Sequence, residues 1–318
     1  LFWAVCGGSP GAFGVTMDLV FHPIIDDEFK HSAAFKGGVL YNEATMKGML
    51  SILQDYVNRC QDGDEKAVSP KIDLMMTLDT KNDNASPIIK PSVIVFEMVC
   101  MDRDDPQAAK DFDEFLGRFK KLRGWFPHWD GKWDGKYHLP MSKISLGFTR
   151  QAPAVTKEGR ENVRPYNKTT YGSNSPLKNG FVEAYGNLLD RLAHDKHDVH
   201  CVFQVGVGGG AQRRNGVAGK SAISHRNART MIVFDLFRRE TKESIAAAVE
   251  YQRCFEFDVV DKYMTAPING VPQPKVMAQW ASHGDLDMSK KEVWEKYFDI
   301  PEDYHRLRAI KAAVDPQD

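Results

Sequence analysis

The hydrophobic and polar positions of this 318-residue chain follow two periods, which predicts a mixture of strands and helices. Around 71–78 apolar and polar side chains alternate, with Ile72, Leu74 and Met76 apolar and Asp73 and Thr77 polar. An alternation of period two is typical of a strand with one face buried and one face wet. A helix period appears elsewhere in the chain, most clearly after Pro106.

Seven strands are predicted, near 33–40, 71–78, 92–100, 143–149, 166–171, 199–206 and 230–237. Four amphipathic helices are predicted, near 43–59, 106–121, 177–193 and 241–261. In the second helix Asp105 is the expected N-cap, Pro106 occupies the first helical position, and four apolar residues share one side, namely Phe112, Phe115, Leu116 and Phe119. Because the strands at 71–78 and 92–100 have no helix between them, the pattern indicates an α+β fold with a largely antiparallel sheet covered by helices.

The first fifteen residues read LFWAVCGGSPGAFGV, an apolar, strand-like start followed by a glycine-rich turn. A second strand is expected at 16–21. Glycine permits positive φ and close backbone approach, so successive N–H groups of this turn could line an anion or a ring. The alternative is a tight turn between two buried strands. Since the chain starts in an apolar strand-like run, we expect it to be an N-terminally truncated piece.

This N-terminal segment resembles the end of the FAD-binding domain in the FAD-linked oxidases of the berberine-bridge-like group, a branch of the vanillyl-alcohol-oxidase-type flavoproteins. Two positions depart from the family pattern: Cys6 stands where Arg or Leu is usual, and Ala12 where Asn is usual. The resemblance implies FAD as the cofactor. It places at the cofactor Gly7, Gly8, Gly11, Ala12, Phe13, Gly14 and Val15.

The C-terminus resembles the same family, through Trp294-x-x-Tyr297-Phe298 and the later Tyr304-His305-Arg306-Leu307. The family's short linker with an Asn before Arg-Leu is replaced by 299–303, a form associated with fungal members. The implied division is the end of an FAD-binding domain at 1–25, a substrate-binding domain at 26–280, and a berberine-like segment at 281–318 that returns to the FAD domain.

Composition limits the partners of the chain. The net charge of −1 gives no overall attraction to nucleic acid, and no apolar stretch reaches the roughly 18 residues of a membrane span. The five cysteines are an odd number without metal-like spacing, so at least one is free within this chain. The sequons at Asn84 and Asn167 are interpreted as chance matches, because Pro87 weakens the first and the second lies in a predicted strand.

Three further motifs have both a functional and a simpler structural interpretation. Gly206–Gly210 precedes a polar hairpin-like stretch rather than a helix, which argues against a dinucleotide loop. His194, His197 and His200 belong to a helix end and a strand start, so we expect no metal site. The loop 125–137, with its repeated Trp-Asp-Gly-Lys, either stacks sugars or aromatic substrates or is a packed surface loop.

The candidate catalytic residues are histidines placed by the resemblance. Trp280 and His283 occupy the two tyrosine positions of the family's Tyr-x-Asn-Tyr motif, so His283 is the expected proton acceptor, with a loop histidine as the alternative. His225 follows the glycine run, where the family has His-Arg, as either a site residue or a structural one. The family's Lys-x-Gln is replaced by Ile232-Val233-Phe234, which predicts a more apolar substrate pocket.

The implied function is an FAD-dependent oxidoreductase, secreted or acting in intracellular secondary metabolism. It would take hydride from a small-molecule C–H next to a hydroxyl or amine, and molecular oxygen would reoxidise the flavin to give hydrogen peroxide. No nucleic acid, membrane or metal partner is expected. The alternative is a non-catalytic carbohydrate- or small-molecule-binding protein that retains the fold.

Overall fold

The structure is a computed structural model. It describes residues 1–8, 12–15, 17–20, 23, 25–59, 67–80, 93–127, 133–136, 138–148, 166–173, 175–207, 221–223, 228–265, 277–278, 289–295, 297–298 and 300–317.

The centre of the molecule is an eight-stranded sheet in which every described pair of neighbours is antiparallel. In sheet order the strands are β4 (Trp125–Pro127), β1 (Ala33–Leu40), β3 (Val93–Cys100), β2 (Ile72–Asp79), β6 (His200–Val207), β7 (Thr230–Phe237), β5 (Tyr166–Ser173) and β8 (Met277–Ala278). The predicted α+β class with a largely antiparallel sheet is confirmed.

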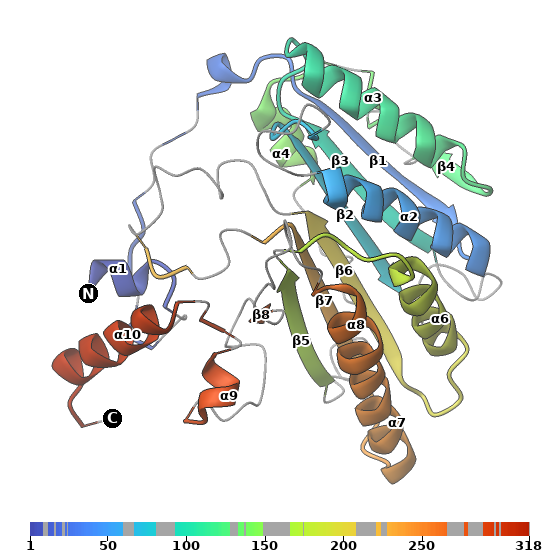
Figure 1. Ribbon diagram of the computed structural model, residues 1–318. Coiled ribbons are helices and arrows are strands. Elements are labelled where there is room, and N and C mark those ends of the chain that lie inside the picture. Colours follow the sequence, from blue (N-terminus) through green and yellow to red (C-terminus); the bar gives the residue numbers. More distant parts are fainter. Residues whose placement is uncertain are drawn as a thin grey trace.

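Four long helices cover one face of this sheet (Figure 1). They are α2 (Glu43–Arg59), α3 (Pro106–Lys120), α6 (Phe181–Ala193) and α7 (Lys242–Arg253). Their apolar sides and the inward residues of the strands form the main core, which includes the fully buried aromatic side chains Phe112, Phe203, Phe234 and Phe255. The opposite face carries no long helix among the described residues.

Shorter elements complete the described chain. They are α1 (Phe2–Val5), η1 (Asp26–Glu28), α4 (Met141–Phe148), the π-helix η4 (Cys254–Val260), α8 (Asp261–Tyr263), α9 (Lys291–Trp294) and α10 (Pro301–Val314). Of the helices in the described ranges, none is long and apolar enough to cross a membrane.

Most predicted elements lie within a few residues of their predicted bounds. The strand at 33–40 and the helix at 43–59 have the predicted limits. Asp105 caps α3 as predicted, since its Oδ1 accepts the N–H groups of Gln107 and Ala108. The helix predicted at 241–261 is α7 continued by η4 and α8.

The strand predicted at 143–149 is wrong, because this segment is helix α4. Its apolar residues alternate in sequence, yet among the side chains whose burial is described, at 141–146, Ile144 alone is buried while Leu146 is 71% exposed. Asp26 holds the start of the helix, since its carboxylate accepts hydrogen bonds from the backbone N–H and the hydroxyl of Ser142.

The strand-like start predicted at Leu1–Val5 is also wrong. Phe2–Val5 form helix α1, which buries Trp3 and Ala4 on one side while Phe2 stays exposed. Of the second predicted strand, residues 17–20 are described, and they belong to no strand and are exposed. Contacts with distant segments, described below, decide the conformation of this terminus.

Candidate functional site

The glycine turn that follows α1 begins as a continuation of the helix. The backbone N–H of Gly8 donates to the carbonyl of Ala4 at 2.7 Å, and the N–H of Cys6 donates to Phe2 at 3.0 Å. The chain then turns through Ala12–Val15, while Gly11 lies outside the described residues. The turn therefore starts from a helix C-terminus and not from a strand.

The first two glycines of this turn are packed against protein. Gly7 has φ +141°, and a Cβ there would lie 2.5 Å from Cγ1 of Ile223. A Cβ on Gly8 would lie 2.5 Å from Cδ2 of Leu307 and 2.7 Å from the carbonyl oxygen of Ala4. These two positions need glycine because other parts of the same chain approach them.

Gly14 differs from these two glycines, because its surroundings are open. Its φ is +135°, and no described atom lies within 4 Å of the position a Cβ would take. Val15 beside it is 86% exposed, whereas Phe13 is half-buried against an aromatic cluster. A glycine at positive φ with open space on its outer side is suited to close approach by a bound ring or anion.

The aromatic cluster behind the turn joins the two ends of the chain. Trp3 and Ala4 of α1 pack with Trp294, Tyr297, Phe298 and Leu307, forming a small core separate from the main one. The guanidinium of Arg306 lies 4.1 Å from the ring centroid of Trp3, a cation–π contact. Figure 1 shows α1 and α10 side by side, so the two segments that resemble the same family meet in space.

Ala222 also belongs to the terminal cluster, and Glu256 lies between the cluster and the sheet. The N–H of Ala222 donates to the carbonyl of Trp3 at 3.1 Å. The hydroxyl of Tyr171 on β5 donates to Glu256 of η4 at 2.7 Å. Burial, together with the charge of Glu256, raises the pKa of Tyr171 and of Tyr297, so both phenols stay protonated. Because the same carboxylate acts on Tyr171 of β5 and on Tyr297 of the terminal cluster, Tyr297 lies near the β5 edge of the sheet.

The face of the sheet away from the long helices carries a mixed set of side chains. Strand alternation places Thr77, Gln204 and Val233 in one row of this face, on β2, β6 and β7. Met75 and Met231 belong to the neighbouring row. We call this surface, with Asp73 and Asp235, the open face.

Two carboxyl groups on the open face have the chemistry of proton acceptors. Asp73 keeps contact with solvent, yet the surrounding protein desolvates its carboxyl and raises its pKa, an effect partly opposed by the N–H of Leu74. Asp235 is half-buried on β7, opposite Val202 in the register. Neither residue is among the predicted site residues, because only the register of the sheet brings them to the same face.

The predicted catalytic residues Trp280, His283 and His225 lie outside the described residues. Their described flanks, however, reach the same end of one strand. Met277 and Ala278 pair with Gly172 and Tyr171 of β5.

The flank of His225 meets the same strand end, because the N–H of Arg229 donates to the carbonyl of Ser173 at 2.6 Å. The described flanks of both predicted histidine segments therefore meet β5 at residues 171–173.

Of the Ile232-Val233-Phe234 motif, only Val233 belongs to the open face. Ile232 and Phe234 are fully buried in the main core. The replacement of the family's polar pair thus concerns one side chain of the open face and two of the core.

The tryptophans of the loop 125–137 that are described are occupied by protein contacts. Trp133 is 7% exposed and packs on Ala34 and Ile144. Trp125 stacks on Phe35 at a centroid distance of 6.3 Å. These two rings therefore offer no free platform for a sugar, while Trp129 lies outside the described residues.

The histidines at 194 and 200 have separate surroundings. His194 Nδ1 contacts the carbonyl of Asp190 at the end of α6, at 2.9 Å. The ring of His200 stacks on Phe237 at the start of β6, with centroids 4.7 Å apart.

No protein-family model matches the chain. No curated protein matches it either. Among solved structures, the chain is similar to the oxidoreductase GilR, solved with pregilvocarcin, at a TM-score of 0.64 and 14% identity, covering 99% of this chain and 61% of that one. The fold is that of the berberine-bridge-like FAD oxidases.

Two further solved structures support the same fold. A berberine bridge enzyme variant described as a reticuline dehydrogenase matches at a TM-score of 0.55 and 14% identity, over 99% of this chain and 58% of that one. The glucooligosaccharide oxidase of Acremonium strictum, whose FAD is described as 6-S-cysteinyl, 8α-N1-histidyl, matches at 0.54 and 12%, over 90% and 53%. The chain thus spans between about half and three fifths of the length of these structures.

Proposed function

We propose that this chain is part of an FAD-dependent oxidoreductase and supplies one wall of the cofactor site and the substrate-facing sheet. The observation that carries the proposal is the fold shared over 99% of the chain with an oxidoreductase of known structure. The meeting of the glycine turn and the C-terminal segment in one cluster agrees with it, since both resemble the same family.

The residues present fit the cofactor at one point of the turn. Gly14 presents an open backbone position, whereas Gly7 and Gly8 are filled by Ile223 and Leu307. We therefore propose that the part of the turn at Gly11–Val15 faces FAD, and that Gly7 and Gly8 fix the turn from behind. When bound, FAD would supply the hydride acceptor, with molecular oxygen as the final oxidant and hydrogen peroxide as the product.

We propose the open face as the substrate-facing wall. Met75 and Met231 would contact the apolar part of the substrate, and Gln204 and Thr77 would orient its polar group by hydrogen bonds, while Val233, 6% exposed, lies beneath them. The substrate class that fits is a largely apolar small molecule with a C–H next to a hydroxyl or amine.

For the proton acceptor we retain His283, with Asp73 as a second candidate. An imidazole has a pKa near neutrality, and desolvation raises the pKa of Asp73, which makes its carboxylate a stronger proton acceptor than an ordinary aspartate. The deciding measurement is the rate of anaerobic flavin reduction by substrate in the flavin-loaded enzyme.

We expect His283→Ala to lower that rate by about 10²- to 10⁴-fold, the range for loss of general-base assistance. Asp73→Asn should lower it much less, and His225→Ala should reduce stability more than rate. A rate that survives in His283→Ala but collapses in Asp73→Asn transfers the role to the carboxyl. If no candidate substrate reduces the flavin in any preparation, the proposal of an oxidoreductase fails.

A further inference from the structure

A groove lies at the other edge of the molecule, between helix α3 and the segment 133–136. Its volume is about 450 Å³, within the range of about 300 to 1,000 Å³ typical of ligand pockets. The segment 133–136 runs beside β1, and Asp134 forms an isolated antiparallel β-bridge with Phe35 of that strand. The sheet order puts β1 and β5 near opposite edges, so this groove is separate from the open face and the glycine turn.

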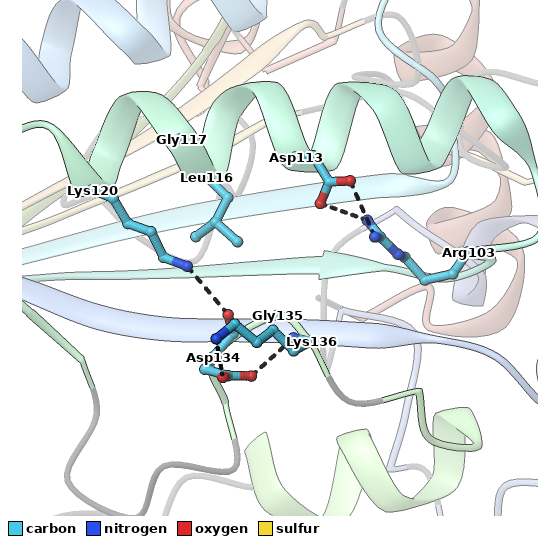
Figure 2. Close-up of a pocket in the computed structure, with 8 residues that line it drawn as sticks. All are labelled: Arg103, Asp113, Leu116, Gly117, Lys120, Asp134, Gly135 and Lys136. Carbon is cyan, nitrogen blue, oxygen red and sulfur yellow. Dashed lines mark hydrogen bonds and ion pairs between the residues drawn. The ribbon is translucent and has the colours of Figure 1, made fainter.

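Charged side chains stand at both ends of the groove, and between them lie Gly117, Gly135 and the largely buried Leu116. Figure 2 shows Arg103 with Asp113 at one end, Lys120 at the other, and Leu116 pointing from α3 toward Gly135. Arg103 and Asp113 form a double hydrogen bond, at 2.9 and 3.1 Å, so their charges largely satisfy each other.

The ammonium group of Lys120 lacks such a partner. Its Nζ reaches the backbone carbonyl of Asp134 at 3.5 Å, a weak bond, and lies over the rings of Phe35 and Trp125 at 5.5 and 5.8 Å. Among the described residues it forms no ion pair. Lys136 on the facing wall is 80% exposed. Its Nζ lies 3.8 Å from Asp134 Oδ2, which is a long ion pair and leaves its N–H groups accessible. The groove thus has two cationic groups with donors available to a ligand.

The helix carries a glycine where the groove is lined by α3. Gly117 lies in the interior of α3, and no described atom is within 4 Å of the position a Cβ would take. Glycine in a helix interior costs about 0.5 to 1 kcal/mol relative to alanine. Packing against other residues requires glycine at Gly8 but not at Gly117. Close approach of a ligand to the helix would require it at Gly117.

From these features we propose that the groove binds a small polyhydroxy carboxylate of hexuronate size. Its carboxylate would accept hydrogen bonds from Lys120 and Lys136. Its hydroxyl groups would donate to the carboxylates of Asp113 and Asp134 at the two walls, and its ring would lie against Gly117 of α3. The ligand is anionic because the groove is lined by three cationic side chains, Arg103, Lys120 and Lys136, and only two carboxylates, Asp113 and Asp134.

The test is isothermal titration calorimetry of the 318-residue chain, with sodium D-glucuronate, D-glucose and inorganic phosphate titrated in separate experiments. We expect glucuronate to bind at one site, with glucose and phosphate each at least about tenfold weaker, since the first lacks the charge and the second lacks the hydroxyl pattern. Lys120→Met should weaken glucuronate binding by about tenfold or more, and Gly117→Leu, which fills the floor, should abolish it.

Lys110→Met is the matched control, because Lys110 is an exposed residue of the same helix outside the groove. It should leave the affinity within about twofold. If Lys120→Met unfolds the chain, Lys136→Met at the exposed wall replaces it, with the same expected loss. Glucose binding as tight as glucuronate, phosphate binding as tight, or an unchanged affinity in the lysine variants would each overturn the proposal.

Discussion

Three glycines near the N-terminus have different physical roles. Gly7 and Gly8 allow Ile223 and Leu307 to approach the backbone, whereas Gly14 has positive φ with open space beside it. A methyl group added at the first two would meet protein, and at the third it would face strain in φ alone. Substitutions at Gly7 and Gly8 should therefore affect folding, and substitutions at Gly14 should affect binding.

Gly8→Ala should destabilise the chain by about 1 to 3 kcal/mol, because the new Cβ would lie 2.7 Å from the carbonyl of Ala4 and against Leu307. Gly117→Ala, a matched change in open space within α3, should stabilise it by about 0.5 to 1 kcal/mol. Urea unfolding of both variants measures the free energies. If Gly8→Ala does not lower the free energy of unfolding, the close contact at Gly8 does not exist.

Asp73 gives a prediction about pH. Its pKa in the folded chain is raised by desolvation, so the folded state holds this proton more firmly than the unfolded state does. The wild type therefore loses stability as the pH rises from about 3.9, the ordinary Asp value, through the raised pKa. Asp73→Asn does not share this loss.

We accordingly expect Asp73→Asn to gain stability relative to wild type as the pH rises. The difference between the variant's free energy of unfolding and that of the wild type should be larger at pH 7 than at pH 3. Urea unfolding at the two pH values measures it. Asp18→Asn, on the exposed segment 17–20, is the control and should show no such change. A difference between Asp73→Asn and wild type that is constant with pH would contradict the desolvation of this carboxyl.

At the scale of elements, hydrophobic periodicity predicted most of the sheet and its covering helices. It succeeded where one face is buried along the whole element, as in β2 and α3. It failed at α4, where the burial of a single side chain, Ile144, and the cap from Asp26 outweigh the alternation of three apolar residues. It also failed at α1, whose conformation depends on a partner segment some 290 residues away.

The candidate site was predictable only in part for a related reason. The glycine turn was visible in sequence as a turn, but which glycines face outward depends on Leu307 and Ile223. Asp73 and Asp235 are single polar residues in strands, and only the sheet register brings them to one face with Gln204. Such long-range neighbours leave no local pattern.

The pairing of α1 with α10 can be tested by itself. Leu307→Ala should destabilise the terminal cluster by about 2 to 5 kcal/mol, because Leu307 is 4% exposed among aromatic side chains. Since this cluster is separate from the main core, the effect should be local. Hydrogen exchange should show faster exchange at Cys6 and Gly8, with β6 unchanged.

Leu146→Ala is the control, as Leu146 is 71% exposed on α4 and its loss should alter neither region. Uniform acceleration of exchange across both the terminal cluster and β6 in Leu307→Ala would show that the two clusters unfold as one unit.

At the scale of the whole molecule, the described chain has a large helix-covered sheet and a small terminal cluster, and the proposed cofactor contact lies on the small cluster. The chain spans 53 to 61% of the length of the compared structures. One open turn at Gly14 would give few of the hydrogen bonds that an FAD molecule needs.

We therefore expect the 318-residue chain, mixed with FAD and desalted, to retain far less than one flavin per chain, as measured from the visible flavin absorption band. Equilibrium dialysis should still detect weak binding, since the open turn is preformed, and Gly14→Val should remove it because a branched side chain is strained at φ +135° and blocks the approach. Ala12→Asn, which restores the family's residue, should retain or strengthen it. Stoichiometric flavin in the desalted wild type would show that this chain alone holds a complete cofactor site, and equal dialysis results for wild type and Gly14→Val would move the contact away from the turn.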